Sequence, residues 1–521
     1  MPPYKLQTTL IGAIRRSEAK EISFNCRDLI KRGQAVRMSS SEPYMDEIKR
    51  KLSSIRARFY FKTGEINVLK SPSNFHETLK QKILQAKERV FLASLYIGKG
   101  QEDLIECLNR ALEKNPKLRV YVLIDGLRGT REAPSKCSVS LVSQLLDKHQ
   151  DRVDLRLYRT PAYVGWKGWL IPRRVNEGLG LQHMKIYGFD QEVILSGANL
   201  SSDYFTNRQD RYYVFNSRSF SNYYFDLQQL ISGLSYKVEK SDNDQKFGLL
   251  WPKDNLAIEP TSDKTQFILE SSAAISNFLL NKPEHRAPPN EDEKEYPTLV
   301  YSISQFTPLF PHGQDLSTEK PTILSLISSI KKPSISWTFT AGYFNVLPEI
   351  KRELISTPSE QATVITASPH ANGFFESKGV SAHLPAAYLH LSKKFLKSVK
   401  RHGKEANIIL REWKNGIVNK PGGWSYHAKG LWIADTSSGD PRPMITCVGS
   451  SNYTRRAYSL DLESNAVILT RDNQLRNEMQ RELDKLLLNT KKVNLEDFRN
   501  EPHRKVGSGV KLATFFLGRR L

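Results

Sequence analysis

Cysteine is scarce in this 521-residue chain, and its four cysteines form no CxxC pair. Long stretches separate Cys26, Cys107, Cys137 and Cys447, which argues against a zinc site and against a disulfide framework. The chain also lacks any run of about 18 apolar residues, so we expect no transmembrane helix. These absences disfavour small disulfide-stapled proteins and integral helical membrane proteins.

Acidic residues are also in deficit. Lysine and arginine total 77 against 55 aspartate and glutamate residues, a formal net charge of +22. Such a balance favours anionic partners, namely nucleic acid, acidic lipid surfaces or phosphorylated substrates, without choosing among them. With 39% hydrophobic and 25% charged residues the chain can bury sizeable cores, and its length suits two to four domains or one double domain.

Residues 1–50 are typical of a leader. Basic residues precede the first acid, Glu18, and apolar residues are interspersed among them. This pattern favours a mitochondrial transit peptide over a secretory signal, with an ordinary basic tail as the alternative.

Apolar strands alternate with helical patterns twice along the chain. The first series of strands covers 89–98, 118–126 and 153–159, and the second covers 334–344, 362–374 and 406–413. Strands alternating with helices predict βαβ units, and the period of about 240 residues is that of a duplicated domain. We therefore predict an α/β fold with a first domain at 51–250, a linker region at 251–300, a second domain at 301–495 and a basic, apolar tail at 496–521.

A histidine and a lysine stand two residues apart once in each repeat. His183 and Lys185 form the first pair, and His427 and Lys429 the second. Residues two apart in a strand share a face, so each pair should project together. Each pair is followed by a strand that ends in small residues and an asparagine, Asn199 in the first repeat and, with Ser450, Asn452 in the second.

This set suits a phosphate group. The two lysines would neutralise its charge, Asn199, Asn452 and Ser450 would bind its oxygens, and one imidazole would attack phosphorus while the other protonates the leaving oxygen. No metal ligand set is evident. Asp210 and Glu463 each follow an asparagine by eleven residues and are predicted to orient the histidines, the alternative being ordinary surface carboxylates.

The repeated motif resembles the phospholipase D superfamily, whose signature is H-x-K-x4-D followed by G-S-x-N, present twice. His183, Lys185 and Asp190 match the first copy, with "SGAN" in place of its turn. The second copy matches with "GSSN" intact, but Asp435 lies one residue late. The resemblance covers roughly residues 75 to 490. It implies two pseudo-twofold-related α/β/α sandwich domains with mixed, largely parallel sheets, and adds Asp190 and Asp435 to the catalytic set, where they would orient the strand and its loop.

Within the superfamily the chain most resembles the eukaryotic mitochondrial phosphatidylglycerophosphate synthases, in "ASLYIGKG", "DGLRGTR" and "SGANLSSDYFTNRQDRY". This resemblance implies the substrates CDP-diacylglycerol and glycerol 3-phosphate and the products phosphatidylglycerol phosphate and CMP, the first committed step toward phosphatidylglycerol and cardiolipin. It implies a phosphohistidine on His183 with His427 as acid and base, although the two roles could be reversed.

The same resemblance implies a protein peripheral to the matrix side of the mitochondrial inner membrane, with an anionic membrane surface as partner and no nucleic acid. No cofactor is required by the motif, and a divalent cation could act through the substrate diphosphate. The alternative function is a phospholipase D-type nucleic-acid phosphodiesterase, a nuclease or a tyrosyl-DNA phosphodiesterase, which the positive charge suits equally.

Further cations are expected near a site that takes a second phosphate. The arginines considered for this role are Arg128, Arg131, Arg173, Arg208 and Arg411. Two loops that combine tryptophan with basic residues, 163–174 and 413–424, suit either a membrane interface or a lid over the site.

Overall fold

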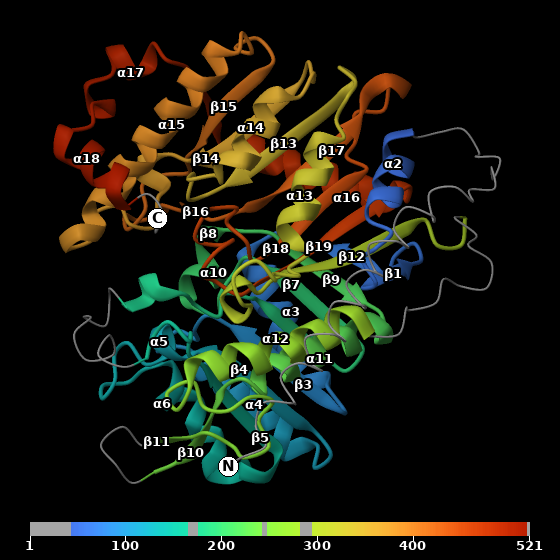
Figure 1. Ribbon diagram of the computed structural model, residues 1–521, viewed down its shortest axis with the longest axis vertical. Helices are drawn as coiled ribbons and strands as arrows, with labels where there is room; N and C mark the ends of the chain where they lie inside the picture. Colours follow the sequence, from blue (N-terminus) through green and yellow to red (C-terminus); the bar gives the residue numbers. More distant parts are fainter. Residues whose placement is uncertain (1–42, 165–175, 242–246, 282–293, 518–521) are drawn as a thin grey trace, which may run out of the picture. The chain divides into compact units, whose positions relative to one another are not determined.

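Two nine-stranded sheets carry the fold, and each gathers one repeat of the sequence (Figure 1). The computed structural model describes residues 43–164, 176–241, 247–281 and 294–517. Residues Tyr44–Leu521 form one unit, to which the following description applies. Most of the predicted leader, most of the first tryptophan loop, the charged segment 282–293 and the last four residues lie outside the described part.

The strand order is the same in both sheets over most of their width. The first sheet runs β11 (Phe247–Leu250), β10 (Tyr236–Lys240), β5 (Val153–Tyr158), β4 (Arg119–Asp125), β3 (Arg89–Ser94), β6 (Ile186–Phe189), β7 (Glu192–Ser196), β9 (Tyr212–Asn216) and β2 (Ile66–Val68). The second runs β20 (Thr490–Val493), β15 (Ile408–Trp413), β14 (Ala362–Ala367), β13 (Ile335–Ala341), β17 (Lys429–Asp435), β18 (Ile445–Gly449), β19 (Glu463–Thr470), β12 (Thr298–Gln305) and β1 (Arg58–Phe61). The predicted duplication is therefore visible in the topology.

Both sheets are mixed, as predicted, but they are not largely parallel. Among the described strands, parallel pairing within the sheets joins β3 to β4 and β4 to β5, and likewise β13 to β14 and β14 to β15. The strands that carry the motifs pair antiparallel. The physical reason is connection length, because helical crossovers permit parallel neighbours whereas the short turn between β6 and β7 forces an antiparallel hairpin.

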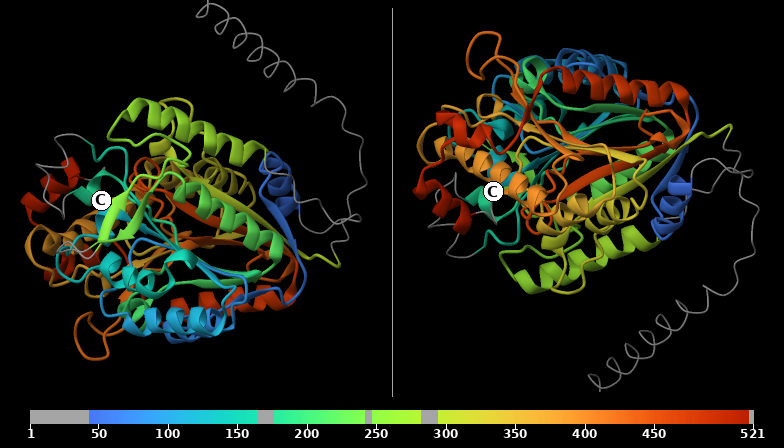
Figure 2. Two further views of the ribbon diagram at one scale, coloured as in Figure 1. Left: turned by 90° about the horizontal axis from the view of Figure 1, so that it is seen from below. Right: turned by 90° about the horizontal axis from the view of Figure 1, so that it is seen from above.

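Helices cover the sheets on both sides (Figure 2). The longer ones are α2 (Pro43–Lys51), α3 (Pro72–Gln85), α4 (Glu102–Lys114), α11 (Arg218–Ser232), α12 (Lys264–Asn281), α13 (Glu319–Ser328), α14 (Pro348–Ser356), α15 (Leu384–Arg401), α16 (Asn473–Leu488) and α18 (Ser508–Leu517). Shorter ones are α5 (Gly126–Gly129), α6 (Ser138–Val142), α7 (Leu146–His149), α10 (Ser202–Thr206) and α17 (Asp497–Asn500).

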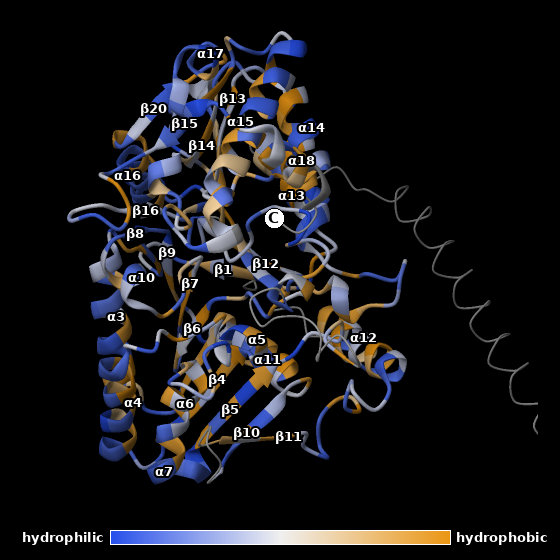
Figure 3. Cartoon of the chain, turned by 90° about the vertical axis from the view of Figure 1, so that its left-hand side faces the viewer, coloured by the Kyte–Doolittle hydropathy of each residue, from blue (hydrophilic) through white to orange (hydrophobic). Residues whose placement is uncertain are grey.

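Three large apolar cores hold these layers together. One lies under α3 and α4 in the first repeat, and another under α13, α14 and α15 in the second. The third is shared, since α11, α12 and α16 bury side chains there together with strands of both sheets. Figure 3 shows the central strands β4 and β5 largely apolar and the outer side of α4 largely polar. Because they share this core, the two repeats pack directly against each other.

The predicted boundaries differ from the structure in four places. Helix α2 buries Met45 and Ile48 in the second core, so residues 43–50, which were predicted as part of a leader, belong to the folded unit. Strand β1 pairs with β12 in the second sheet, although it was assigned to the first domain. The region 251–300 contains α12, and the tail contains α18, which packs against α15. Sequence periodicity could not show these exchanges because they depend on pairing between distant segments.

Candidate active site

Backbone hydrogen bonds join the two repeats beside each motif histidine. The N–H of His183 donates to the carbonyl of Leu462 (2.9 Å), and the N–H of Leu462 donates to that of Leu181 (2.8 Å). At the related place β16 (Ser425–Tyr426) lies parallel to β8 (Arg208–Gln209), and the N–H of His427 donates to the carbonyl of Gln209 (2.9 Å). Each histidine is thus fixed against the other repeat.

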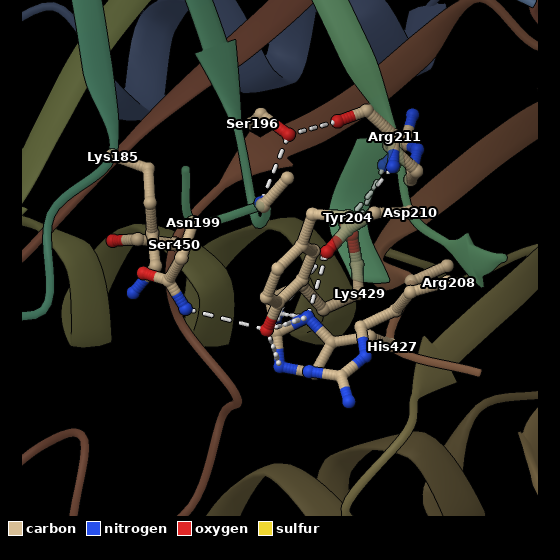
Figure 4. Close-up of polar contacts among 12 residues, drawn as sticks. Lys185, Ser196, Asn199, Tyr204, Arg208, Asp210, Arg211, His427, Lys429 and Ser450 are labelled. Carbon is tan, nitrogen blue, oxygen red and sulfur yellow. Dashed lines mark hydrogen bonds and ion pairs between the residues drawn. The ribbon is translucent and has the colours of Figure 1, made fainter. Parts of the chain in front are cut away.

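As a result each histidine meets the acid of the opposite repeat. His183 Nδ1 lies 2.9 Å from Glu463 Oε1, and His427 Nδ1 lies 2.7 Å from Asp210 Oδ2. The second carboxylate oxygens are also held, since Ser450 Oγ donates to Glu463 Oε2 (2.5 Å) and the N–H of Arg211 donates to Asp210 Oδ1 (2.9 Å; Figure 4). A carboxylate at Nδ1 assigns the proton to that nitrogen and leaves the lone pair on Nε2.

Burial tunes the charge of these groups. It lowers the pKa of both His183 and His427 well below 6.5, and the nearby Lys185 and Lys429 lower each further. Both imidazoles are therefore neutral at neutral pH, the form in which Nε2 can act as a nucleophile or a base. Burial also raises the pKa of Glu463 to about 7, against the opposing effect of Lys185.

The two lysines lie in the same buried centre. Lys429 Nζ is 2.8 Å from His427 Nδ1 and 3.8 Å from Asp210 Oδ2, while Lys185 Nζ donates to the carbonyl of His183 (2.5 Å). Burial lowers the pKa of Lys185 to about 7 and also lowers that of Lys429. The strand predicted to carry His183 and Lys185 starts later than expected. Strand β6 begins at Ile186, so both residues precede it. The backbone there pairs with the other repeat instead of its own sheet.

Asn199 is buried beside these groups, and Asn452 is half-buried. Asn199 Nδ2 donates to Tyr204 Oη (3.3 Å), and the Oδ1 atoms of Asn199 and Asn452 have no hydrogen-bond partner among the described residues. An unpartnered amide oxygen accepts hydrogen bonds, so it suits a donor such as a substrate hydroxyl, whereas a phosphoryl oxygen would have to be bound by the amide nitrogens. Ser450 does not fit its predicted phosphate-binding role, because its single hydroxyl proton is directed to Glu463.

The motif aspartates lie away from the histidines, at the far ends of β6 and β17. Asp190 accepts the backbone N–H groups of residues 87, 88 and 89 at 2.8–3.0 Å. Asp435 accepts the N–H of Ser437 (2.9 Å) and the hydroxyl of Ser334 (3.3 Å). They do not belong in the predicted catalytic set. At about 3.3 Å per residue, the strands carry them roughly 20 Å from the histidines. Their contacts agree with the expectation that they orient the strand and its loop.

Two aromatic residues beside His427 did not emerge from the motif. Tyr204 Oη lies 3.2 Å from His427 Nε2, and the ring of Tyr343 meets that of His427 edge-on at 5.5 Å between centroids. Arg208 lies over the ring of Tyr204 at 4.6 Å (Figure 4). The tyrosine-rich stretch after Asn199 is the only sequence signal for this group.

The other arginines considered are occupied elsewhere. Arg131 pairs with Glu177, Arg128 lies over the ring of Tyr96, and Arg411 donates to Thr490. Arg173 lies outside the described residues. Arg208 is thus the one considered arginine, among those described, that adjoins a motif histidine through Tyr204.

Two neutral imidazoles, two lysines and the amide of Asn199 lie around one buried centre, an arrangement of the phospholipase D type that suits phosphoryl transfer. In the described part of the chain, no group of three or more His, Cys, Asp or Glu side chains could hold a metal ion, and no helix is long and apolar enough to cross a membrane.

Comparisons with known proteins narrow this class. No protein-family model matches the chain. The CDP-diacylglycerol–glycerol-3-phosphate 3-phosphatidyltransferase of Saccharomyces cerevisiae is 57% identical over 93% of this chain and 94% of that protein. The Schizosaccharomyces pombe protein of that name is 36% identical over 86% and 93%. The human protein, whose name adds "mitochondrial", is 32% identical over 88% and 83%. The chain belongs to the CDP-diacylglycerol–glycerol-3-phosphate 3-phosphatidyltransferase family.

A solved structure shares the fold. The phosphatidylserine synthase of Haemophilus influenzae superposes with a TM-score of 0.65 over 91% of this chain and 97% of that protein, at 18% identity. The similarity bears out the predicted double α/β architecture.

Proposed function

We propose that the chain transfers the phosphatidyl group of CDP-diacylglycerol to glycerol 3-phosphate, forming phosphatidylglycerol phosphate and CMP. The family supplies the substrates, and one observation supports the chemistry, namely the two buried histidines whose Nδ1 atoms face carboxylates exchanged between the repeats. This arrangement holds two neutral imidazoles with Nε2 available around one centre.

In the first step His183 Nε2 attacks the phosphorus that carries diacylglycerol. The bond from that phosphorus to the CMP oxygen breaks, and His427 donates its Nε2 proton to the departing CMP. His183 suits the nucleophile because its Nε2 has no hydrogen-bond partner among the described residues, whereas His427 Nε2 faces Tyr204 Oη. The negative charge of the substrate favours the protonated form of His427 that this step needs.

In the second step His427 removes the proton from a hydroxyl of glycerol 3-phosphate. The oxygen attacks phosphorus, the phosphorus–nitrogen bond breaks, and His183 returns to its neutral form. Lys185, Lys429 and the amides of Asn199 and Asn452 stabilise the charge on the phosphoryl oxygens. Glu463 and Asp210 keep the imidazoles in the required tautomer.

Trapping the covalent species tests this mechanism. We expect protein mixed with CDP-diacylglycerol labelled at the lipid phosphorus, without acceptor, to acquire label that is stable to base and labile to acid, and His183→Ala to acquire none. Added glycerol 3-phosphate should release the label as lipid product. Absence of lipid product together with cleavage of single-stranded DNA would instead support the phosphodiesterase alternative.

We also propose that any divalent cation acts through the substrate diphosphate and not through protein ligands. Activity after chelation should then return in proportion to the ratio of added Mg²⁺ to CDP-diacylglycerol. Restoration by one equivalent of metal per protein would contradict this proposal.

The chain is further proposed to work on an anionic membrane, at the matrix side of the mitochondrial inner membrane. Helix α15 starts beside the site, where Tyr388 meets Tyr343 at 5.5 Å between ring centroids. It then presents a row of exposed cations, Lys394, Lys397 and Lys400. Helix α18, with Leu512 60% exposed, packs beside it. A basic surface with an apolar helix suits anionic lipid, and its closeness to the site would shorten the path of a lipid substrate.

Sedimentation with vesicles tests the surface. The chain should bind phosphatidylcholine vesicles containing 30% cardiolipin, on the order of the anionic content that recruits basic surfaces, more strongly than pure phosphatidylcholine. The pair Lys394→Glu and Lys397→Glu should weaken this binding about tenfold or more. The matched pair Lys114→Glu, at the end of α4, and Lys117→Glu, in the loop that follows it, should have a much smaller effect, and equal losses in both pairs would refute a localised surface.

A further inference from the structure

The two repeats carry the same ion pair with its signs exchanged. Four and nine residues after Asn199 stand Asp203 and Arg208, whereas four and nine residues after Asn452 stand Arg456 and Asp461. Both pairs form, with Arg208 Nη2 at 3.2 Å from Asp203 Oδ2 and Arg456 Nε at 2.9 Å from Asp461 Oδ2. Pseudo-symmetric positions therefore place opposite charges next to the two histidines.

The arginine on the His183 side is fully engaged. Asp461 is buried, with its side chain 6% exposed, and it accepts from two nitrogens of Arg456 as well as from the N–H of Leu181. Arg456 Nη2 also donates to the carbonyl of Glu177 (2.7 Å). This pair fixes the segment that leads into His183 and leaves little net charge for a ligand.

The arginine on the His427 side is held differently. Its counter-ion Asp203 has a side chain 61% exposed, so water screens the pair and the charge of Arg208 is poorly compensated. The Arg208 side chain itself is only 13% exposed, and its Nε donates to Ser425 Oγ (2.9 Å). Arg208 is thus a fixed, largely buried cation with a weak partner.

Arg208 also stands at a useful distance from the chemistry. Tyr204 separates it from His427, with Arg208 over the Tyr204 ring at 4.6 Å and Tyr204 Oη at 3.2 Å from His427 Nε2 (Figure 4). Gly373 keeps the guanidinium uncovered, because a Cβ at this position would lie 3.2 Å from Arg208 Nη2 and 3.3 Å from Tyr343 Oη. An extended glycerol phosphate spans about 6 Å from its attacking oxygen to phosphorus, and one tyrosine, Tyr204, lies between Arg208 and His427.

We propose that Arg208, with the hydroxyls of Tyr204 and Tyr343, binds the terminal phosphate of the acceptor and so selects a phosphorylated polyol over an uncharged one. The inference rests on the proposed transfer to glycerol 3-phosphate and assigns the acceptor to the His427 side of the site. Planar guanidinium groups suit phosphate oxygens, and tyrosine hydroxyls can donate to those that remain. Arg208 is in this sense a specificity-determining residue.

The test compares two acceptors, glycerol 3-phosphate and glycerol, at saturating CDP-diacylglycerol. Arg208→Gln should lower kcat/KM for glycerol 3-phosphate by about 10- to 100-fold, the size expected for a lost charge-assisted contact, while changing that for glycerol far less. Arg456→Gln is the matched control, and any loss it causes should affect both acceptors equally. Equal losses for both acceptors in Arg208→Gln, or no loss, would overturn the proposal.

Two further measurements keep the outcome decisive. Asp203→Asn removes only the exposed counter-ion, whose charge water already screens, so it should keep the preference for glycerol 3-phosphate over glycerol. Loss of that preference would count against the proposal even if Arg208→Gln fails to fold. Exchange of labelled CMP into CDP-diacylglycerol requires only the first step. Its absence in the parent protein would refute the proposed transfer chemistry, whereas its presence beside unaltered acceptor selectivity in Arg208→Gln would refute the subsite alone.

Discussion

At the residue scale, the lysines act on phosphate only while charged. Burial lowers the pKa of Lys185 to about 7, so its ammonium is lost as the pH rises through that value in the empty site. Bound phosphate favours the charged form, which means that binding takes up a proton above pH 7. Affinity for CDP-diacylglycerol should therefore fall with increasing pH.

We expect KM for CDP-diacylglycerol to rise from about pH 7 upward, by up to tenfold per pH unit for a single proton taken up. Lys185→Arg keeps its charge throughout and should shift this rise to higher pH, whatever its absolute activity. Initial rates between pH 6 and 9 check the prediction, with Arg218→Gln as the control for loss of an exposed cation. An identical alkaline limb in Lys185→Arg would contradict it.

Gly197 lies beside the site, and the second repeat has Ser450 at the corresponding position. An added Cβ would lie 2.6 Å from Asp210 Oδ1 and 2.7 Å from Lys429 Nζ, whereas the related Ser450 has room to contact Glu463. Gly197→Ala should displace the acid and lysine of His427, lower kcat at least tenfold and cost about 1–3 kcal/mol of stability. Gly507→Ala, with no atom within 4 Å of its Cβ, should be neutral in the same assays.

At the scale of elements, Asp190 closes the β6–β7 hairpin onto the start of β3. It adopts a left-handed conformation, with φ of 48°, and accepts three backbone N–H groups. Asp435, one residue late, accepts a single backbone N–H and a hydroxyl. The motif aspartates are thus unequal anchors, and the displaced one makes fewer contacts.

Asp190→Ala should therefore lower the free energy of unfolding by about 1–3 kcal/mol, since three backbone N–H groups lose a charged acceptor. Turnover per folded molecule should remain within about threefold of the parent, because Asp190 is far from the histidines. Thermal denaturation and active-site titration with the labelled donor separate the two effects. A catalytic role would instead appear as loss of turnover at unchanged stability, and Asp435→Ala should be the milder of the two variants.

The sequence allowed much of this to be predicted, and its limits are physical. Spacing alone identified the histidines, the lysines and, eleven residues after each asparagine, Asp210 and Glu463. It could not show that each acid serves the histidine of the other repeat, because that depends on how two distant segments pair. The exchanged charges after the two asparagines were visible in the sequence, but their meaning required the exposure of Asp203 and the burial of Asp461.

At the scale of the whole molecule, the two repeats are bound into one cooperative body. They share the core that contains α11 and α16. Strand β1 precedes the first repeat in the chain but pairs in the second sheet, and backbone hydrogen bonds join the repeats beside both histidines. A repeat unfolded alone would expose this core and leave the histidine of its neighbour without its acid. Intermediates with one folded repeat should therefore be too unfavourable to accumulate.

Calorimetry of the chain should show one transition, with equal calorimetric and van't Hoff enthalpies. Asp190→Ala, a change confined to the first repeat, should move the whole transition to lower temperature without splitting it. Hydrogen exchange read separately in β4 and β14 should then lose protection by the same free energy in both sheets, since both open only in global unfolding. Loss of protection in β4 alone, or a second calorimetric transition, would show that the repeats are independent domains. The contacts between the repeats would then align the histidines without making unfolding cooperative.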